Sequence, residues 1–274
     1  MLHRGYRFWR EMVTQLNKQN ISAFAASTAF FFFLSIVPML VMVCTIIPYT
    51  PLTEANLAMA ITELTPDAMD ALAEGLIAEV YEKSAGILSI AIIATIWSAG
   101  KGVMALMRGL NVISEVEEDR NYFVVRIVSS FYTLVMLLVV ILSLFIMVFG
   151  NQLVEIALYR IPQLKVVVSF AMNFRFVFVW IVLTILFAMM YAYIPNEKLK
   201  FREQLTGAMF SAIAWSVFSW GFSLYVSRAG AYSIYGSLSI IILVMIWMYV
   251  CMYIIMIGAY LNRYFMQINK KSEH

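Results

Sequence analysis

Six long stretches of this 274-residue chain contain no charged residue, and no other feature constrains its fold as strongly. Each stretch is close to or longer than the roughly 20 residues that an α-helix needs to cross about 30 Å of hydrocarbon. Unbroken apolar stretches differ from the alternating segments of a membrane β-barrel, so helices are expected. The sequence therefore predicts an all-α, polytopic membrane helix bundle of about six transmembrane helices. The predicted spans are 21–47, 84–107, 127–154, 176–196, 205–227 and 237–261; the second continues past its uncharged stretch, which ends at Gly100.

The composition excludes a soluble globular protein. The chain is 63% hydrophobic and 13% charged, whereas soluble domains are about half apolar and about a quarter charged. The apolar stretches are spread evenly, which predicts a single membrane domain over residues 1–274. The parts outside the membrane are then an N-terminal segment (1–20), an outer loop (48–84), a linker (108–126) and a C-terminal tail (263–274).

Lys and Arg residues are distributed unevenly between the two sides of these spans. Fourteen of the 19 fall on the side that holds both termini, four fall on the other side, and Arg175 lies at the edge of a span. Because Lys and Arg are enriched in cytoplasmic loops, both termini are expected in the cytoplasm. The fourteen are Arg4, Arg7, Arg10, Lys18, Lys101, Arg108, Arg120, Arg126, Lys198, Lys200, Arg202, Arg263, Lys270 and Lys271.

The outer loop 48–84 is acidic and has apolar residues at helical spacing. It carries seven Asp and Glu residues and only one basic residue, Lys83. Thr65 followed by Pro66 is typical of a helix start, with Thr65 as the cap. We expect short amphipathic helices outside the cytoplasm. A lid packed on the outer mouth of the bundle is favoured over an acidic vestibule that handles cations.

The residue types needed for most catalytic chemistry are missing. The only histidines are His3 and His274, and no motif for nucleotide, metal or nucleophilic chemistry is present. We therefore expect no metal, no cofactor and no enzyme activity. Between Lys101 and Arg126 the four basic residues are matched by four acidic ones, so a nucleic-acid surface is not expected either.

Two basic residues stand next to or within apolar stretches. Lys101 follows seventeen uncharged residues, and Arg175 directly precedes the fourth span. A cation at membrane depth is costly unless it is paired or faces water, so each is a candidate contact for an anionic headgroup. The alternative is an anchor whose side chain snorkels to the interface, and this is favoured for both.

Other candidate residues follow from charge and from helix flexibility. Arg120 and Arg126 lie in the solvated linker, near the level of anionic headgroups. A proline or glycine can break or bend a helix, and small residues let helices approach closely or line a polar path. Close packing is favoured for the serines. The candidate hinge or groove residues are Pro38, Gly100, Gly102, Ser211, Ser219, Ser223 and Gly236.

Several short motifs together resemble those of the BrkB/YihY-type bacterial inner-membrane proteins, a family with a historical ribonuclease BN label. The resemblance covers nearly the whole chain. Where the family commonly has a glutamate after the final Gly-Ala, this chain has Tyr260, so a role for that acid is not carried over. The motifs are AASTAF at 25–30, SIVP at 35–38, WSA at 97–99, GLN at 109–111 with Arg120, YIPN at 193–196, GA at 207–208, YGSL at 235–238 and GAYLN at 258–262.

The resemblance implies six spans with cytoplasmic termini in a bacterial inner membrane. A link between some family members and the export of lipids suggests a transporter or flippase for a lipid or another amphipathic anionic substrate. The alternative is a non-transporting scaffold or envelope assembly factor, and a membrane enzyme is the third hypothesis. Membrane lipids are the expected partners, with a homo-oligomer or an envelope protein as further candidates. The ribonuclease label conflicts with the lack of a metal cluster and of a basic face.

Overall fold

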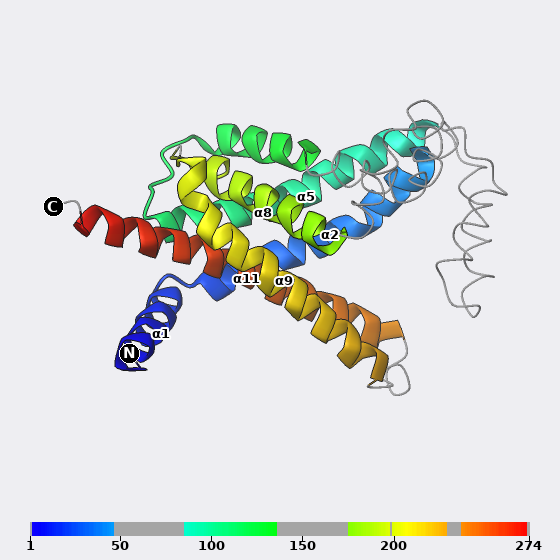
Figure 1. Cartoon of the computed structure of the whole chain (residues 1–274). Coiled ribbons are helices and arrows are strands. Elements are labelled where there is room, and N and C mark those ends of the chain that lie inside the picture. The colour runs from blue at the N-terminus through cyan, green and yellow to red at the C-terminus, as the bar shows by residue number, and fades with distance from the viewer. Residues whose placement is uncertain (1, 47–84, 136–174, 198, 229–236, 273–274) are drawn as a thin grey trace, which may run out of the picture. The chain divides into compact units, whose positions relative to one another are not determined.

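The computed structural model describes residues 2–46, 85–135, 175–197, 199–228 and 237–272, and this part of the chain holds seven helices (Figure 1). The prediction of an all-α fold is confirmed. The predicted helices of the outer loop lie outside the described residues, as does Gly236. The helices are α1 (Leu2–Lys18), α2 (Ile21–Ile46), α5 (Ala85–Ser114), an unlabelled helix (Tyr122–Val135), α8 (Arg175–Tyr193), α9 (Phe201–Arg228) and α11 (Ser237–Ser272).

Three of these helices are long and apolar enough to cross a membrane. Their apolar parts are Ile21–Met39 in α2, Phe201–Val226 in α9 and Ile241–Ile268 in α11. The helices Tyr122–Val135 and Trp180–Tyr193 are apolar but shorter in the described part of the chain. The first, fifth and sixth predicted spans therefore correspond to helices of spanning length, and the other three predicted spans overlap described helices.

Two helices run further than the apolar stretches that predicted them. The second span was expected to end near residue 107, but α5 continues to Ser114 and is about 45 Å long at 1.5 Å per residue. The sixth was expected to end at residue 261, but α11 continues to Ser272 through most of the predicted tail. Hydropathy marks the apolar part of a helix, whereas the helix itself ends where its backbone hydrogen bonds end.

The N-terminal segment, predicted only as a cytoplasmic segment, is the amphipathic helix α1. It buries Met12 and Leu16, which are four residues apart and so share one helix face. Asn20 separates α1 from α2 in a left-handed conformation, with φ of 52°. Asn tolerates this conformation better than most residues, and its carbonyl accepts hydrogen bonds from the first turn of α2.

Residue contacts divide the chain into two compact units. The first contains residues 1–33, 101–129 and 166–274, and the second contains residues 34–100 and 130–165. Within the first unit α9 packs against both α8 and α11. In the described part of the second unit the small polar residues Ser35, Thr95 and Thr133 are buried. Pro38 lies inside α2, which is assigned as one helix through it.

Two glycines set the close approach of α9 and α11. A Cβ atom on Gly207 would lie 2.6 Å from Oδ1 of Asn262, and one on Gly258 would lie 2.7 Å from the carbonyl oxygen of Gly207. Asn262 accepts a hydrogen bond of 2.6 Å from the Gly207 amide and donates one of 3.1 Å to the Gln204 carbonyl. Small residues at a helix crossing let the backbones come this close.

Candidate functional site

The cytoplasmic linker was predicted at 108–126, but its first part, up to Ser114, belongs to α5, and only the residues after Ser114 connect α5 to the next helix. Glu115 follows the helix in a left-handed conformation, with φ of 53°. The amide of Val116 bonds to the carbonyl of Asn111, and that of Glu115 to Val112, which is the Schellman arrangement at a helix C-terminus. Asn121 then starts the next helix, because its Oδ1 accepts a hydrogen bond from the Phe123 amide.

Glu118 and Arg120 form a two-bond ion pair inside this linker. Arg120 Nε lies 2.6 Å from Glu118 Oε1, and Arg120 Nη2 lies 2.7 Å from Oε2. The hydrogen bonds from the guanidinium lower the pKa of the Glu118 carboxyl, and its charge, the Arg120 amide and Asn111 act in the same direction. Both side chains are half-buried. The prediction of a solvated linker therefore holds for its exposed residues Glu117 and Asp119, but not for this pair.

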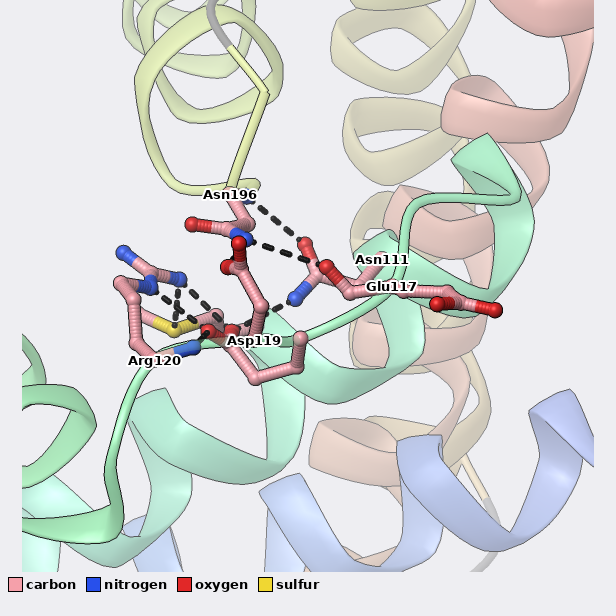
Figure 2. A network of polar contacts seen from close by, with 7 residues as sticks. Asn111, Glu117, Asp119, Arg120 and Asn196 are labelled. Atoms are coloured by element: carbon pink, nitrogen blue, oxygen red, sulfur yellow. Dashed lines mark hydrogen bonds and ion pairs between the residues drawn. The ribbon is translucent and has the colours of Figure 1, made fainter.

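Asn111 connects the ion pair to the turn between α8 and α9 (Figure 2). Its side chain is buried; Nδ2 donates to Glu118 Oε2 at 2.8 Å, and Oδ1 accepts from the Asn196 amide at 2.9 Å. Asn196 Nδ2 in turn donates to Asp119 Oδ1 at 2.6 Å and to the Glu117 carbonyl at 3.0 Å. We call these residues, Asn111, Glu117, Glu118, Asp119, Arg120 and Asn196, the linker clasp.

The linker clasp changes how Arg120 is interpreted. Sequence alone made Arg120 a candidate headgroup contact, but its guanidinium is already neutralised by Glu118 and also reaches Met107 Sδ. We therefore assign it a structural role. Arg126 is half-buried on the helix Tyr122–Val135.

Lys101 lies inside α5, which is continuous from Ala85 to Ser114. The helix break that its flanking glycines allow is absent, and Gly102 serves close packing instead: a Cβ there would lie 2.7 Å from Cδ1 of Phe32. Lys101 is half-buried, with Nζ 5.4 Å from the centre of the Phe31 ring. An ammonium over an aromatic face at this distance is a cation–π contact.

The remaining candidates belong to α5, α8 and α9. Arg175 is the first residue of α8, and Gly100 is buried in α5. Ser211 is buried, shares a hydrogen bond of 2.8 Å with Tyr191 and bonds to the Ile254 carbonyl. Ser219 accepts a hydrogen bond of 3.1 Å from Trp247 Nε1, whereas Ser223 is exposed. Ser211 and Ser219 thus join helices, as the packing interpretation of these serines expects.

No group of three or more His, Cys, Asp or Glu residues that could hold a metal ion occurs in the described part of the chain. Sequence reasoning missed the clasp residues Asn111, Glu118 and Asn196 as partners. Asn111 and Asn196 are 85 positions apart. Both belong to motifs that carried the family resemblance, which was the available signal for them.

These helices and their uncharged lengths define a multi-pass, all-helical membrane protein. Its sequence matches the family described as "Virulence factor BrkB" over residues 12–274, so the chain belongs to the BrkB family and the resemblance is confirmed. It is similar to YfkH of Bacillus subtilis (strain 168), named as a ribonuclease-like protein, with 33% identity over 257 residues, covering 93% of this chain and 94% of that protein. It is also similar to the UPF0761 membrane protein VV0203 of Vibrio vulnificus (strain YJ016), with 26% identity over 265 residues, covering 93% of this chain and 81% of that one. No solved structure matches the chain significantly.

Proposed function

We propose that this protein moves a lipid, or another amphipathic anionic molecule, across the bacterial inner membrane. The observation that carries the proposal is Lys101, a cation placed at the middle of a continuous 30-residue helix and half-buried against Phe31. A cation within a predicted membrane span is costly unless it is paired or faces water, and a residue of this kind is a candidate for a substrate pathway.

In the proposed mechanism the anionic headgroup pairs with Lys101 on the cytoplasmic side and with Arg175 on the outer side. The acyl chains stay in the bilayer while the headgroup passes along the protein. The membership of a multi-pass membrane family supports this proposal. Arg120 has no part in the mechanism, because its charge is held by Glu118.

The test is lipid movement between leaflets in liposomes that contain the purified full-length chain. Labelled anionic and neutral lipids are supplied in one leaflet, with and without an ion gradient, and the protected fraction is measured over time. We expect protein-dependent movement of anionic lipids, reduced at least about tenfold by Lys101→Gln or Arg175→Gln, because each removes a charge-assisted contact worth about 1.5–3 kcal/mol. Lys200→Gln is the matched control, since the Lys200 side chain is 85% exposed just before α9.

Movement that is unchanged in the Lys101→Gln, Arg175→Gln double variant would refute the mechanism. A folded protein that moves no lipid under any gradient would refute transport itself. That second outcome would favour the scaffold hypothesis, which predicts a stoichiometric protein partner on purification.

A further inference from the structure

A polar cavity of about 710 Å³ lies between α1 and α11, beside the end of α5. All of its lining residues belong to the first unit, and its size is within the range of ligand-binding pockets. Unlike most such pockets, it has walls made largely of charged and hydrogen-bonding side chains. Neither Lys101 nor Arg175 contributes to it.

The two facing helices contribute side chains at helical spacing. On α1, Arg10, Thr14 and Lys18 are four residues apart, so they share one face of the helix and span about 12 Å along its axis. On α11, Tyr260 and Tyr264 are likewise four residues apart. The polar face of α1 thus lies across the cavity from the phenol side chains of Tyr260 and Tyr264.

Some charged residues of the cavity are paired with residues that the structure describes, and others are not. Arg263 is not available to a ligand, because it pairs with Glu115 and donates to the Ser114 carbonyl. Arg10, Glu11 and Lys18 are exposed on α1, and the ion pairs within the described part of the chain involve none of the three. The cavity therefore offers two cations and one carboxylate.

This pattern matches a ligand that carries charges of both signs. Arg and Lys bind phosphate oxygens through charge-assisted hydrogen bonds, and a carboxylate binds an ammonium group in the same way. A phosphate that carries no amine would place its negative charge next to the Glu11 carboxylate, which would repel it. Tyr260 stands at the predicted end of the α11 membrane span at residue 261, and Arg263, Tyr264 and Gln267 lie within one to two turns after that end. This position near the end of a span is one that a lipid headgroup and a soluble molecule can both reach.

We infer that this cavity is a binding site for a zwitterionic aminoalkyl phosphate, with the phosphate on Arg10 and Lys18 and the amine on Glu11. The ligand is either the headgroup of a lipid or the free molecule. The inference does not depend on transport, because binding is measured on its own.

The test measures binding to the purified full-length chain in detergent. Phosphoethanolamine and glycerol phosphate are titrated by calorimetry, and short-chain phosphatidylethanolamine and phosphatidylglycerol are compared by native mass spectrometry. We expect at least about tenfold tighter binding of the amine-bearing member in at least one pair. Arg10→Gln with Lys18→Gln should weaken both members of that pair, whereas Glu11→Gln should remove only the preference for the amine.

Arg202→Gln, an exposed change at the start of α9 outside the cavity, is the matched control and should leave binding unchanged. The pair that binds identifies the source of the ligand: the soluble pair means a free metabolite, and the lipid pair alone means a membrane headgroup. Absence of binding in both pairs, no preference for the amine, or binding unaffected by the α1 double variant would overturn the inference. Circular dichroism and size-exclusion profiles establish that each variant is folded.

Discussion

Single residues at the crossing of α9 and α11 decide how closely these helices approach. Gly258 faces the Tyr191 hydroxyl, which also donates to the Ile255 carbonyl at 2.7 Å and shares a hydrogen bond with Ser211. One added methyl group at residue 258 of α11 would therefore meet both α8 and α9 at once. Packed interiors resist such additions, because neither backbone nor buried side chains can move far without losing other contacts.

Gly258→Ala is expected to lower the free energy of unfolding by about 1–3 kcal/mol, since an extra carbon in a close-packed site displaces its neighbours. The measurement is the thermal midpoint of the purified protein in detergent. Gly221→Ala is the matched control: it lies on α9, and a Cβ there meets no atom within 4 Å. An equal loss of stability in the two variants would show that glycine content, rather than contact at residue 258, matters.

Glu118 makes the stability of the clasp depend on pH. Its pKa is lowered from the usual 4.5, chiefly by the hydrogen bonds from Arg120, so its charge stabilises the fold above that value. Protonation removes this contribution as the pH falls through the lowered pKa. At pH 7 Glu118→Gln should therefore melt at a lower temperature than the native protein, and the gap should close as the pH falls well below 4.5.

The control for this pH series is Glu117→Gln, because the exposed Glu117 joins the clasp only through its backbone carbonyl. It should follow the native protein at every pH. If the difference in melting temperature between the native protein and Glu118→Gln stays constant from neutral to acidic pH, the charge of Glu118 does not explain the loss of stability. The changed shape of the side chain would then be the cause.

Among the helices, the linker clasp joins elements that are distant in the sequence. It ties the last turns of α5, the linker and the turn between α8 and α9 to one another, in the first unit (Figure 2). Arg263 adds α11, because it binds both the end of α5 and Glu115. Buried Asn111 is the centre of this arrangement, since its amide serves as donor on one side and acceptor on the other.

Asn196→Ala should loosen the linker without unfolding the helices. It removes the two side-chain hydrogen bonds to Glu117 and Asp119, each worth about 0.5–1.5 kcal/mol, and more where the partner is charged. Hydrogen exchange read by mass spectrometry should become faster in peptides covering 115–121, and unchanged within α9. Glu197→Ala, an exposed change in the same turn, is the control. Equal exchange of the linker in Asn196→Ala and native protein would refute the clasp.

Sequence patterns identified most helices but only part of what connects them. The uncharged stretches predicted α2, α5, α8, α9 and α11, because apolar length is a local property. They did not predict that α1 is helical or that α5 reaches Ser114, since a search for uncharged stretches finds membrane spans only. The signal for α1 is instead the helical spacing of apolar residues such as Met12 and Leu16. The partners of Arg120 could not be predicted for a different reason: a hydrogen-bond network between positions 111, 118 and 196 is a tertiary property that no window along one sequence contains.

The family motifs contain the residues that form these tertiary contacts, but the sequence alone does not show that they touch. GLN at 109–111, Arg120 and YIPN at 193–196 meet in the linker clasp, and GA at 207–208 and GAYLN at 258–262 meet at the crossing of α9 and α11. Motifs that were separate in the sequence are thus paired in space. The structure explains them by packing and hydrogen bonding, so their presence alone does not argue for catalysis.

For the whole molecule, the distribution of charge predicts one orientation in the membrane. The side that holds both termini carries fourteen Lys and Arg residues, against four on the other side. Transfer of so many cations near span ends across the membrane is disfavoured, so both termini should stay in the cytoplasm. That orientation would place the clasp and the cavity between α1 and α11 at the cytoplasmic leaflet, because both adjoin the last turns of α5 and of α11.

Reporter fusions to the full chain and to its truncations test this orientation. Green fluorescent protein fused after residue 274 should fluoresce and alkaline phosphatase fused there should be inactive, because the tail is expected in the cytoplasm. Alkaline phosphatase fused after Arg228 should instead be active, since the end of α9 is expected on the opposite side. Active phosphatase after residue 274 would reverse the orientation. Lys101 and the cavity would then meet the outer leaflet, so the protein would take up its substrate from outside the cell membrane.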